Sequence, residues 1–149
     1  MRTRPVLSSL ELSILGAVQQ TARSGYAIRK ALDSSPGAIY PALRRLAAAG
    51  FLEKRDGYHL TAEGRRALKS GLQGPAIQEV RRDPDGVAVR ADLLTGSTAS
   101  AFLTEYARLA AICEDEWKSQ EGLAARYRAA MYAARARWAS RTAASLKGR

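Results

Sequence analysis

Cysteine and histidine are nearly absent from this chain of 149 residues, which contains only Cys113 and His59. One cysteine cannot form a disulfide within the chain, and one cysteine with one histidine is too few for a four-ligand structural zinc site. We therefore expect no metal and no other cofactor. The alanine-rich, helical surroundings of Cys113 favour a small buried side chain over a redox sensor.

Long apolar runs and catalytic motifs are also missing. No apolar run approaches the ~20 residues that a membrane span requires, so we expect no membrane contact. Ser8, Ser9 and Glu11 interrupt the segment that would follow the basic residues 1–5 in a secretory signal, which indicates a cytoplasmic protein. We find no Ser/His/Asp order, no acidic pair near His59 and no phosphate-binding glycine loop, and we therefore expect no enzymatic activity.

Positive charge is what the sequence has in excess. The formal net charge is +10 and the calculated pI is about 10.4, which indicates an anionic partner, nucleic acid before a membrane surface. Residues 1–72 contain 12 Lys or Arg against 5 Asp or Glu, whereas residues 73–149 contain 12 against 9. The first half is therefore the better candidate for contact with phosphates.

Capping residues predict the first two helices. Ser8 and Glu11 have the spacing of a capping box, and the helix that they begin should end near Gln20. Ser24 is a typical N-cap for a second helix. The inner face of this second helix is predicted to consist of Ile28, Ala31 and Leu32.

A third helix is predicted from Ser35, with Pro36 at its first helical position and Gly50 as its C-cap. The apolar residues that recur at helical intervals are Ile39, Leu43 and Leu46. Pro41 lacks the amide hydrogen that would bond back to residue 37, so we expect an irregular or tightened first turn.

A β-hairpin should follow this helix. Residues 51–55 and 58–60 have the composition of two short strands, and the Asp56-Gly57 pair between them is typical of a hairpin turn. Thr61 is a predicted N-cap for a fourth helix, which should run from residue 62 to about residue 69, with Leu68 pointing inward.

Three helices and a hairpin form the winged helix-turn-helix arrangement, and the third helix is suited to the DNA major groove, which is about 12 Å wide. Its outer face is small at the N-terminal end and cationic further along. Arg44 or Arg45 could contact a guanine, hold a phosphate or remain a solvated surface charge. Lys54 and Arg55 lie where a wing would cover the minor groove or backbone, although such residues are often only solubilising.

Several segments of residues 8–68 resemble the PadR family of bacterial transcriptional regulators. They are Leu10-Glu11-Leu12-Ser13-Ile14-Leu15-Gly16, Ser24-Gly25-Tyr26-Ala27-Ile28, Gly50-Phe51-Leu52, Tyr58-His59-Leu60-Thr61-Ala62-Glu63-Gly64 and, most diagnostic, Ser35-Pro36-Gly37-Ala38-Ile39-Tyr40-Pro41-Ala42-Leu43-Arg44-Arg45-Leu46. The resemblance implies a winged helix domain, a helical dimerisation segment and repression by occupation of an operator. It also implies that residues 35–45 form the recognition helix and that Tyr26 contacts a phosphate.

The resemblance is incomplete in two places. The turn at residues 33–34 is shorter than the segment that is common in the family. Residues 73–149 match only loosely, at Asp83-Pro84, Leu93-Leu94 and Trp138, so no effector can be carried over. The candidate DNA-binding residues are Ser24, Tyr26, Ser35, Gly37, Ala38, Tyr40, Arg44, Arg45, Lys54, Arg55, Tyr58 and His59.

The second half is predicted to be helical beyond a linker at residues 71–86, which has a short ordered piece around residues 77–80. Helix should resume at residues 87–94, break at residues 95–97 and begin again with Ser97 or Thr98 as its cap. Two long amphipathic helices follow, and pairing with a second chain would bury their apolar stripes. The predicted dimer interface consists of Phe102, Tyr106, Leu109, Cys113, Trp117, Tyr127, Met131 and Trp138.

Trp117 and Trp138 have two interpretations: packing in the interface, or the walls of a cavity that binds a small aromatic effector. We expect a mainly α-helical chain with a two-stranded β wing, in which residues 1–72 bind DNA and residues 73–149 form a helical dimerisation domain. The expected function is that of a homodimeric regulator at the nucleoid, a repressor on a palindromic DNA operator. The alternative is a winged helix that binds protein or RNA.

Overall fold

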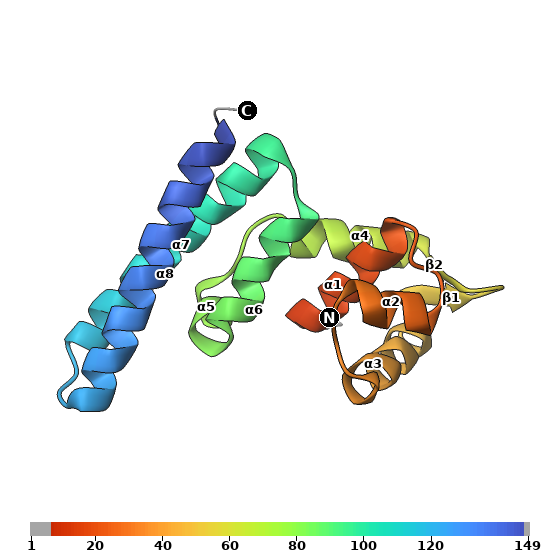
Figure 1. Cartoon of the computed structure of the whole chain (residues 1–149), viewed down its shortest axis with the longest axis horizontal. Helices are drawn as coiled ribbons and strands as arrows, with labels where there is room; N and C mark the ends of the chain where they lie inside the picture. The colour runs from red at the N-terminus through yellow and green to blue at the C-terminus, as the bar shows by residue number, and fades with distance from the viewer. Residues whose placement is uncertain (1–6, 148–149) are drawn as a thin grey trace, which may run out of the picture. The chain divides into compact units, whose positions relative to one another are not determined.

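The computed structural model describes residues 7–147, so the basic residues 1–5 considered above lie outside the described part. The chain divides into two compact units with the boundary between Gly71 and Leu72. The first contains α1 (Ser9–Gln19), α2 (Gly25–Ala31), α3 (Pro36–Ala48), β1 (Leu52–Lys54), β2 (Tyr58–Leu60) and α4 (Ala62–Gly71), as Figure 1 shows. The second contains α5 (Ile77–Arg82), α6 (Pro84–Val89), the 3₁₀ helix η1 (Arg90–Leu93), α7 (Gly96–Lys118) and α8 (Leu123–Lys147). The predicted fold class, mainly helical with a two-stranded wing after the helices, is confirmed.

The helix starts of the first unit are set by the serines that the sequence indicated. The Ser8 hydroxyl accepts a hydrogen bond from the Glu11 amide, and the Glu11 carboxylate accepts one from the Ser8 amide, both at 3.1 Å. The hydroxyls of Ser24 and Ser35 cap α2 and α3 in the same way, at 3.0 and 3.3 Å. Each cap gives a hydrogen-bond partner to an amide of the first helical turn, a contribution of about 1 kcal/mol.

One apolar core holds the first unit together. Each fully buried Leu or Ile contributes roughly 1.5–3 kcal/mol, so the positions of α1, α2 and α3 follow from their buried stripes. Ile28 of α2 is buried as expected, but Ala31 is exposed, which corrects the predicted inner face of this helix. The principal core side chains are Leu12, Ile14, Leu15, Val18, Ile28, Ile39, Leu43, Leu46, Leu52 and Leu68.

Helix α3 begins with a tightened turn and then continues as a regular helix through Pro41. The amides of Ala38 and Ile39 both donate to the carbonyl oxygen of Ser35, each at 3.1 Å, and the first of these bonds spans only three residues. Because this turn is closed by Ser35, the amide that Pro41 lacks is not needed to hold it. Beyond the helix, Gly50 has a φ of +83°, the left-handed conformation that favours glycine.

The hairpin consists of three residue pairs and a three-residue turn. Leu52 lies opposite Leu60, and Lys54 lies opposite Tyr58, which leaves residues 55–57 as the loop. Asp56 and Gly57 both have positive φ, at 51° and 104°, as the Asp-Gly signal requires. The hydroxyl of Thr61 then donates to the Gly50 carbonyl at 2.6 Å and accepts from the Gly64 amide at 3.0 Å, which joins the segment after α3 to the first turn of α4.

Helical structure in the second unit begins earlier than predicted. Helix α5 starts at Ile77 and α6 at Pro84, so most of the expected linker at residues 71–86 is helical. Asp83 caps α6 by accepting from the Gly86 amide at 3.1 Å. Helix α7 starts at Gly96 after Thr95, with no side-chain cap, so the predicted caps Ser97 and Thr98 lie inside the helix instead. The positive φ of Gly96, 51°, allows the chain to enter the helix there.

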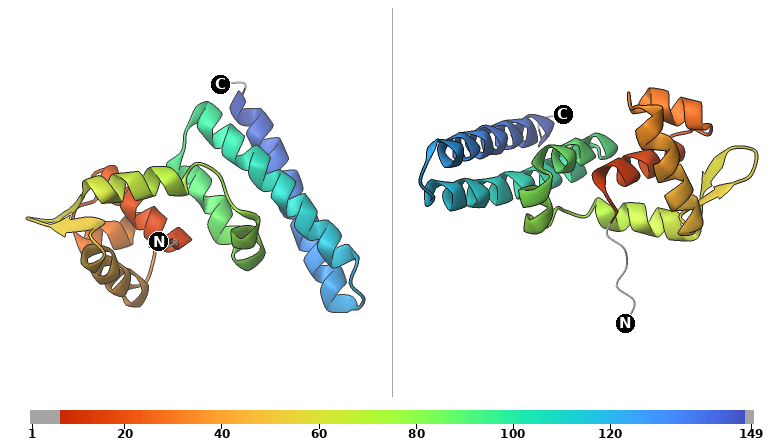
Figure 2. Two further views of the ribbon diagram at one scale, coloured as in Figure 1. Left: turned by 180° about the vertical axis from the view of Figure 1, so that it is seen from behind. Right: turned by 90° about the horizontal axis from the view of Figure 1, so that it is seen from below.

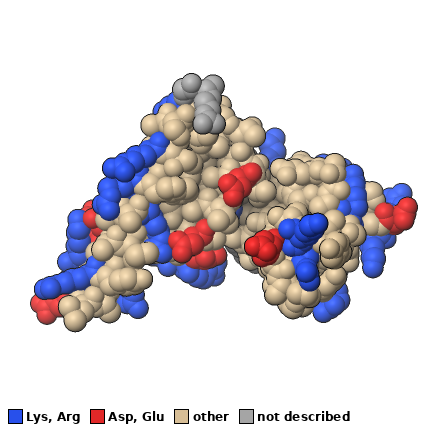
Figure 3. Space-filling view, in the orientation of Figure 1, with Lys and Arg blue, Asp and Glu red and all other residues tan. Residues whose placement is uncertain are grey.

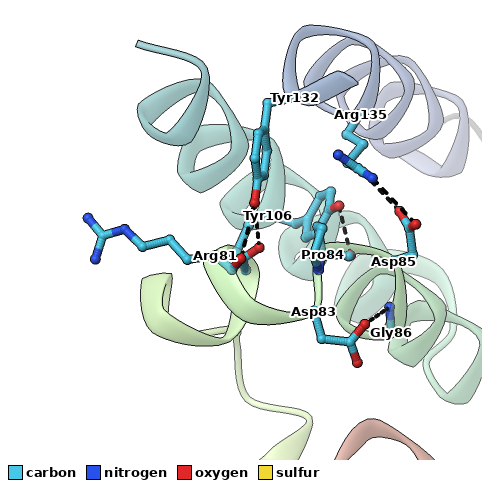
Figure 4. A network of polar contacts seen from close by, with 9 residues as sticks. Arg81, Asp83, Pro84, Asp85, Gly86, Tyr106, Tyr132 and Arg135 are labelled. Atoms are coloured by element: carbon cyan, nitrogen blue, oxygen red, sulfur yellow. Dashed lines mark hydrogen bonds and ion pairs between the residues drawn. The ribbon is translucent and has the colours of Figure 1, made fainter. Parts of the chain in front are cut away.

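Helices α7 and α8 lie side by side, as the two views of Figure 2 show. Their core also includes α5 and α6, which are fastened by two tyrosine hydroxyls: Tyr106 donates to the Pro84 carbonyl at 2.9 Å, and Tyr132 to the Val80 carbonyl at 3.0 Å (Figure 4). Arg135 pairs with Asp85 at 2.9 Å on the same side. Burial raises the pKa of Tyr106 to about 12, so this hydroxyl remains a donor at physiological pH.

The predicted interface residues divide into three groups: four are buried, Tyr127 and Trp138 are exposed, and Trp117 and Met131 are half-buried. Phe102, Tyr106, Leu109 and Cys113 are 0–4% exposed within a single chain, so they belong to the core of the second unit and are corrected from interface to core. Burial raises the pKa of the Cys113 thiol, which keeps it protonated and unreactive. On α8 the buried residues are small ones, together with Tyr132, whereas Tyr127 and Trp138 are 66% and 48% exposed. The predicted apolar stripe of α8 therefore faces outward.

Candidate nucleic-acid interface

Helix α3 presents one buried face and one cationic face. Its inner residues, Ile39, Ala42, Leu43 and Leu46, have no exposed surface, whereas Arg44 and Arg45 are exposed. At the N-terminal end, no atom lies within 4 Å of where a Cβ on Gly37 would stand, so this end of the helix is open to a ligand. Such a helix can enter a major groove without losing its attachment to the core.

Tyr40 joins α3 to the beginning of α2. Its side chain is 40% exposed, and its ring lies against Gly25, where a Cβ atom would stand only 2.6 Å from Tyr40 Cε1. The absence of a side chain at Gly25 therefore sets the position of the Tyr40 ring. The hydroxyl end of Tyr40 can reach a nucleic acid, while the ring body packs between the two helices.

The N-terminal end of α2 holds two further candidates. Tyr26 is 64% exposed, and the Arg29 guanidinium lies 5.9 Å from the centre of its ring, so the two side chains form one exposed patch. Ser24, like Ser35 on α3, uses its hydroxyl oxygen to cap its own helix. Both hydroxyls keep a hydrogen that they can donate to a phosphate oxygen.

Two of the hairpin cations have partners of their own. The Lys54 ammonium lies 5.6 Å from the centre of the Tyr58 ring, and Arg55 pairs with Glu53 at 2.9 Å. Acidic and basic side chains accordingly lie next to each other at the end of the hairpin in Figure 3. Because Glu53 offsets Arg55, Lys54 with Tyr58 is the better candidate for a phosphate contact.

Arg23 is a residue near the hairpin that the sequence did not single out. Its guanidinium Nη1 lies 2.6 Å from His59 Nδ1, and its carbonyl oxygen accepts from the Tyr58 amide at 2.7 Å. Arg23 lies 35 positions before Tyr58, in a loop, and no local pattern links the two residues. The basic charge of this loop is the one sequence signal that could have marked it.

The structure brings all the predicted DNA-binding residues onto the first unit, on α2, α3, the hairpin and the serine caps before the two helices. It does not bring Trp117 and Trp138 together within one chain. Trp117 lies in the last turn of α7, next to the loop between α7 and α8, under the Arg128 guanidinium at 4.6 Å, and Trp138 lies about four turns from that loop. The hollow beside Trp117 that the described residues form is not lined by Trp138.

The second unit has a shallow groove between α7 and α8. Part of its floor is small, formed by Ala107, Ala111, Ala136 and Ser140. Arg108, Arg137 and Arg141 line the same part. The part near the loop between the helices has two acidic residues, Glu114 and Glu121, and two basic ones, Lys118 and Arg126. No described helix is long and apolar enough to cross a membrane, and no group of His, Cys, Asp and Glu among the described residues could hold a metal ion.

Residues 14–70 match the model of the transcriptional regulator PadR-like family. No curated protein matches the chain. Among solved structures, the crystal structure of the PadR-like transcriptional regulator BC1756 from Bacillus cereus is similar, with 19% identity and a TM-score of 0.41 over 93% of this chain and 98% of that chain.

Proposed function

Residues 14–70 form a domain of the PadR-like family of transcriptional regulators, and we propose that this DNA-binding regulator is a repressor that occupies a palindromic operator as a homodimer. The family is one of DNA-binding regulators, not of enzymes. The observation that carries the proposal is the outer face of α3, where Tyr40, Arg44 and Arg45 are exposed above a fully buried inner stripe. Gly37 and Ala38 are small and let this face approach the base edges closely. The wing residues Lys54 and Tyr58 contact the adjacent phosphate backbone of the DNA.

The experiment is a selection of bound fragments from the source genome, followed by footprinting. A specific regulator should recover sites with two related half-sites about one helical turn apart and prefer them at least ~10³-fold over random duplex. Binding that ignores DNA sequence, or that is tighter for RNA, would favour the alternative function of a winged helix that binds another polyanion.

Two adjoining features of the second unit support the homodimer. The outward stripe of α8 has two exposed aromatic side chains, Tyr127 and Trp138, with the half-buried Met131 between them. The α7–α8 groove beside it has a floor of alanines and a serine. A two-fold axis would place this stripe of each protomer in the groove of its partner, as an isologous interface requires.

The same antiparallel pairing would bring Trp138 of one protomer level with Trp117 of its partner. Trp138 lies about four turns from the α7–α8 loop and Trp117 lies in the turn next to it, so a two-fold axis midway between those levels would bring the two side chains to the same level. A flat aromatic effector could then bind between the two indoles. We propose such a compound as the signal that releases the operator.

A further inference from the structure

Arg23, between α1 and α2, contacts the hairpin at three consecutive residues. Its carbonyl oxygen accepts from the Tyr58 amide at 2.7 Å, and its guanidinium Nη1 lies 2.6 Å from His59 Nδ1. A Cβ built on Gly57 would stand 3.1 Å from both the Cβ and the carbonyl oxygen of Arg23. Near its loop, the hairpin therefore contacts this one residue between α1 and α2, in addition to the core contacts of Leu52.

The contacts of His59 define where its proton lies. A guanidinium can only donate, so Nδ1 facing Arg23 must be the unprotonated acceptor. The other ring nitrogen, Nε2, lies 3.0 Å from the carbonyl oxygen of Arg55, which can only accept, so Nε2 carries the hydrogen. His59 in this arrangement is a neutral ring that links Arg23 to the loop of the hairpin.

We propose that Arg23 and His59 form a positioning pair that fixes the wing relative to the N-terminal end of α2, so that the phosphate contacts of the two elements keep one spacing. The proposal rests on the proposed DNA binding. Ser24 and Tyr26 lie one and three positions after Arg23, Tyr58 is one of its contacts, and Lys54 is paired with Tyr58 on the neighbouring strand.

The hairpin needs such an anchor because it is small. Each strand has three residues, and a two-stranded hairpin of this length is marginally stable alone in water. A wing that is already fixed loses less conformational freedom when it binds, which strengthens binding without a new contact to DNA. The charged groups around His59 are Arg23, Arg55 and Glu53, and Glu53 lies opposite His59 in the register and pairs with Arg55.

Nitrogen-15 NMR of the histidine ring in the full chain without DNA tests the anchor itself. With a single histidine, the assignment is unambiguous. We expect the Nε2–H tautomer in the wild-type chain and a changed Nδ1 resonance in Arg23→Ala, with no change in Arg66→Ala, which removes an exposed arginine of the same unit. An Nδ1–H tautomer, or a ring that does not respond to Arg23→Ala, would overturn the pair.

Fluorescence anisotropy with a labelled duplex of mixed sequence tests the consequence for binding. His59→Ala should weaken binding roughly three- to ten-fold, the scale of one hydrogen bond, with an unchanged salt dependence because a neutral ring is removed. His59→Gln, whose amide offers both an acceptor and a donor, should restore the affinity, and the double variant with Arg23→Ala should bind no worse than Arg23→Ala alone. Unchanged affinity of His59→Ala would overturn the proposal, whereas a wild-type chain that binds no duplex would overturn the proposed function and leave the NMR result standing.

Discussion

The Tyr40 ring lies on Gly25, with 2.6 Å between Tyr40 Cε1 and the position that a Cβ atom on Gly25 would take. This contact joins the first residue of α2 to the outer face of α3, where Tyr40 remains 40% exposed. The relative position of the candidate DNA contacts on α2 and α3 therefore depends on the absence of a side chain at Gly25.

Gly25→Ala should lower DNA affinity without unfolding the protein. The added methyl displaces the Tyr40 ring, which we expect to cost roughly 1 kcal/mol in binding. Alanine is favoured over glycine in a helix by about 0.5–1 kcal/mol, and this offsets the strain of moving a flexible ring. Thermal melts and DNA titrations of the variant measure the two quantities separately. Full affinity with normal stability would show that the position of Tyr40 is irrelevant to binding.

Arg44→Ala distinguishes a base contact from a phosphate contact. If Arg44 reads a guanine, the variant should lose about 1–3 kcal/mol on a specific site and much less on random duplex. Arg45→Ala is the matched comparison, since Arg45 is the exposed neighbour on the same helix. Titration of both variants against both duplexes gives the answer. Equal losses on specific and random DNA would make Arg44 a phosphate contact.

Lys54→Ala tests the wing. One lost phosphate contact should reduce the slope of log affinity against log salt concentration by about one. Arg55→Ala should change the slope less, because Glu53 already pairs with Arg55. Affinities measured over a series of salt concentrations provide both slopes. Should the Lys54 variant keep the wild-type slope, the wing does not touch the backbone.

Trp138→Glu should abolish the homodimer and leave the fold intact. The side chain is 48% exposed within one chain, so its replacement costs the monomer little. A carboxylate buried in an interface would cost about 2 kcal/mol or more. Sedimentation equilibrium measures the mass, and Val89→Glu, at another half-exposed apolar residue of the same unit, is the control. A dimer of unchanged affinity would place the interface elsewhere.

An aromatic effector should quench tryptophan fluorescence in a saturable way. Because we place the compound between the two indoles, Trp117→Ala and Trp138→Ala should each abolish saturation rather than halve it. Fluorescence titration with a panel of flat aromatic compounds measures this. If no member of the panel gives a saturable response, the two tryptophans only pack in the interface.

Most helix starts and the hairpin turn of the first unit could be predicted from short sequence motifs. Ser8, Ser24 and Ser35 cap the helices that they were predicted to begin, and the Asp56-Gly57 pair turns the hairpin. These features depend on hydrogen bonds within about four residues, which a sequence displays directly. Ala31 was the exception, because an alanine in a short helix can be placed on either face.

The second unit shows where such reasoning fails. The large apolar residues of α8 repeat at helical intervals, yet Tyr127 and Trp138 face outward while Ala125, Ala129 and Ala139 are buried. Small residues let α7 and α8 pack closely, so the size of the side chains, rather than their hydropathy, determines which face of α8 is buried. The contact between Arg23 and His59 was missed for another reason: it is made in three dimensions between residues far apart in the chain.

Competition between a selected genomic duplex and a scrambled duplex of the same composition is the most direct measurement of the central claim. If α3 reads base edges, the selected duplex should be bound at least ~10³-fold more tightly at physiological salt, and the preference should fall in Arg44→Ala. Equal affinity for the two duplexes would contradict sequence-specific recognition by this helix.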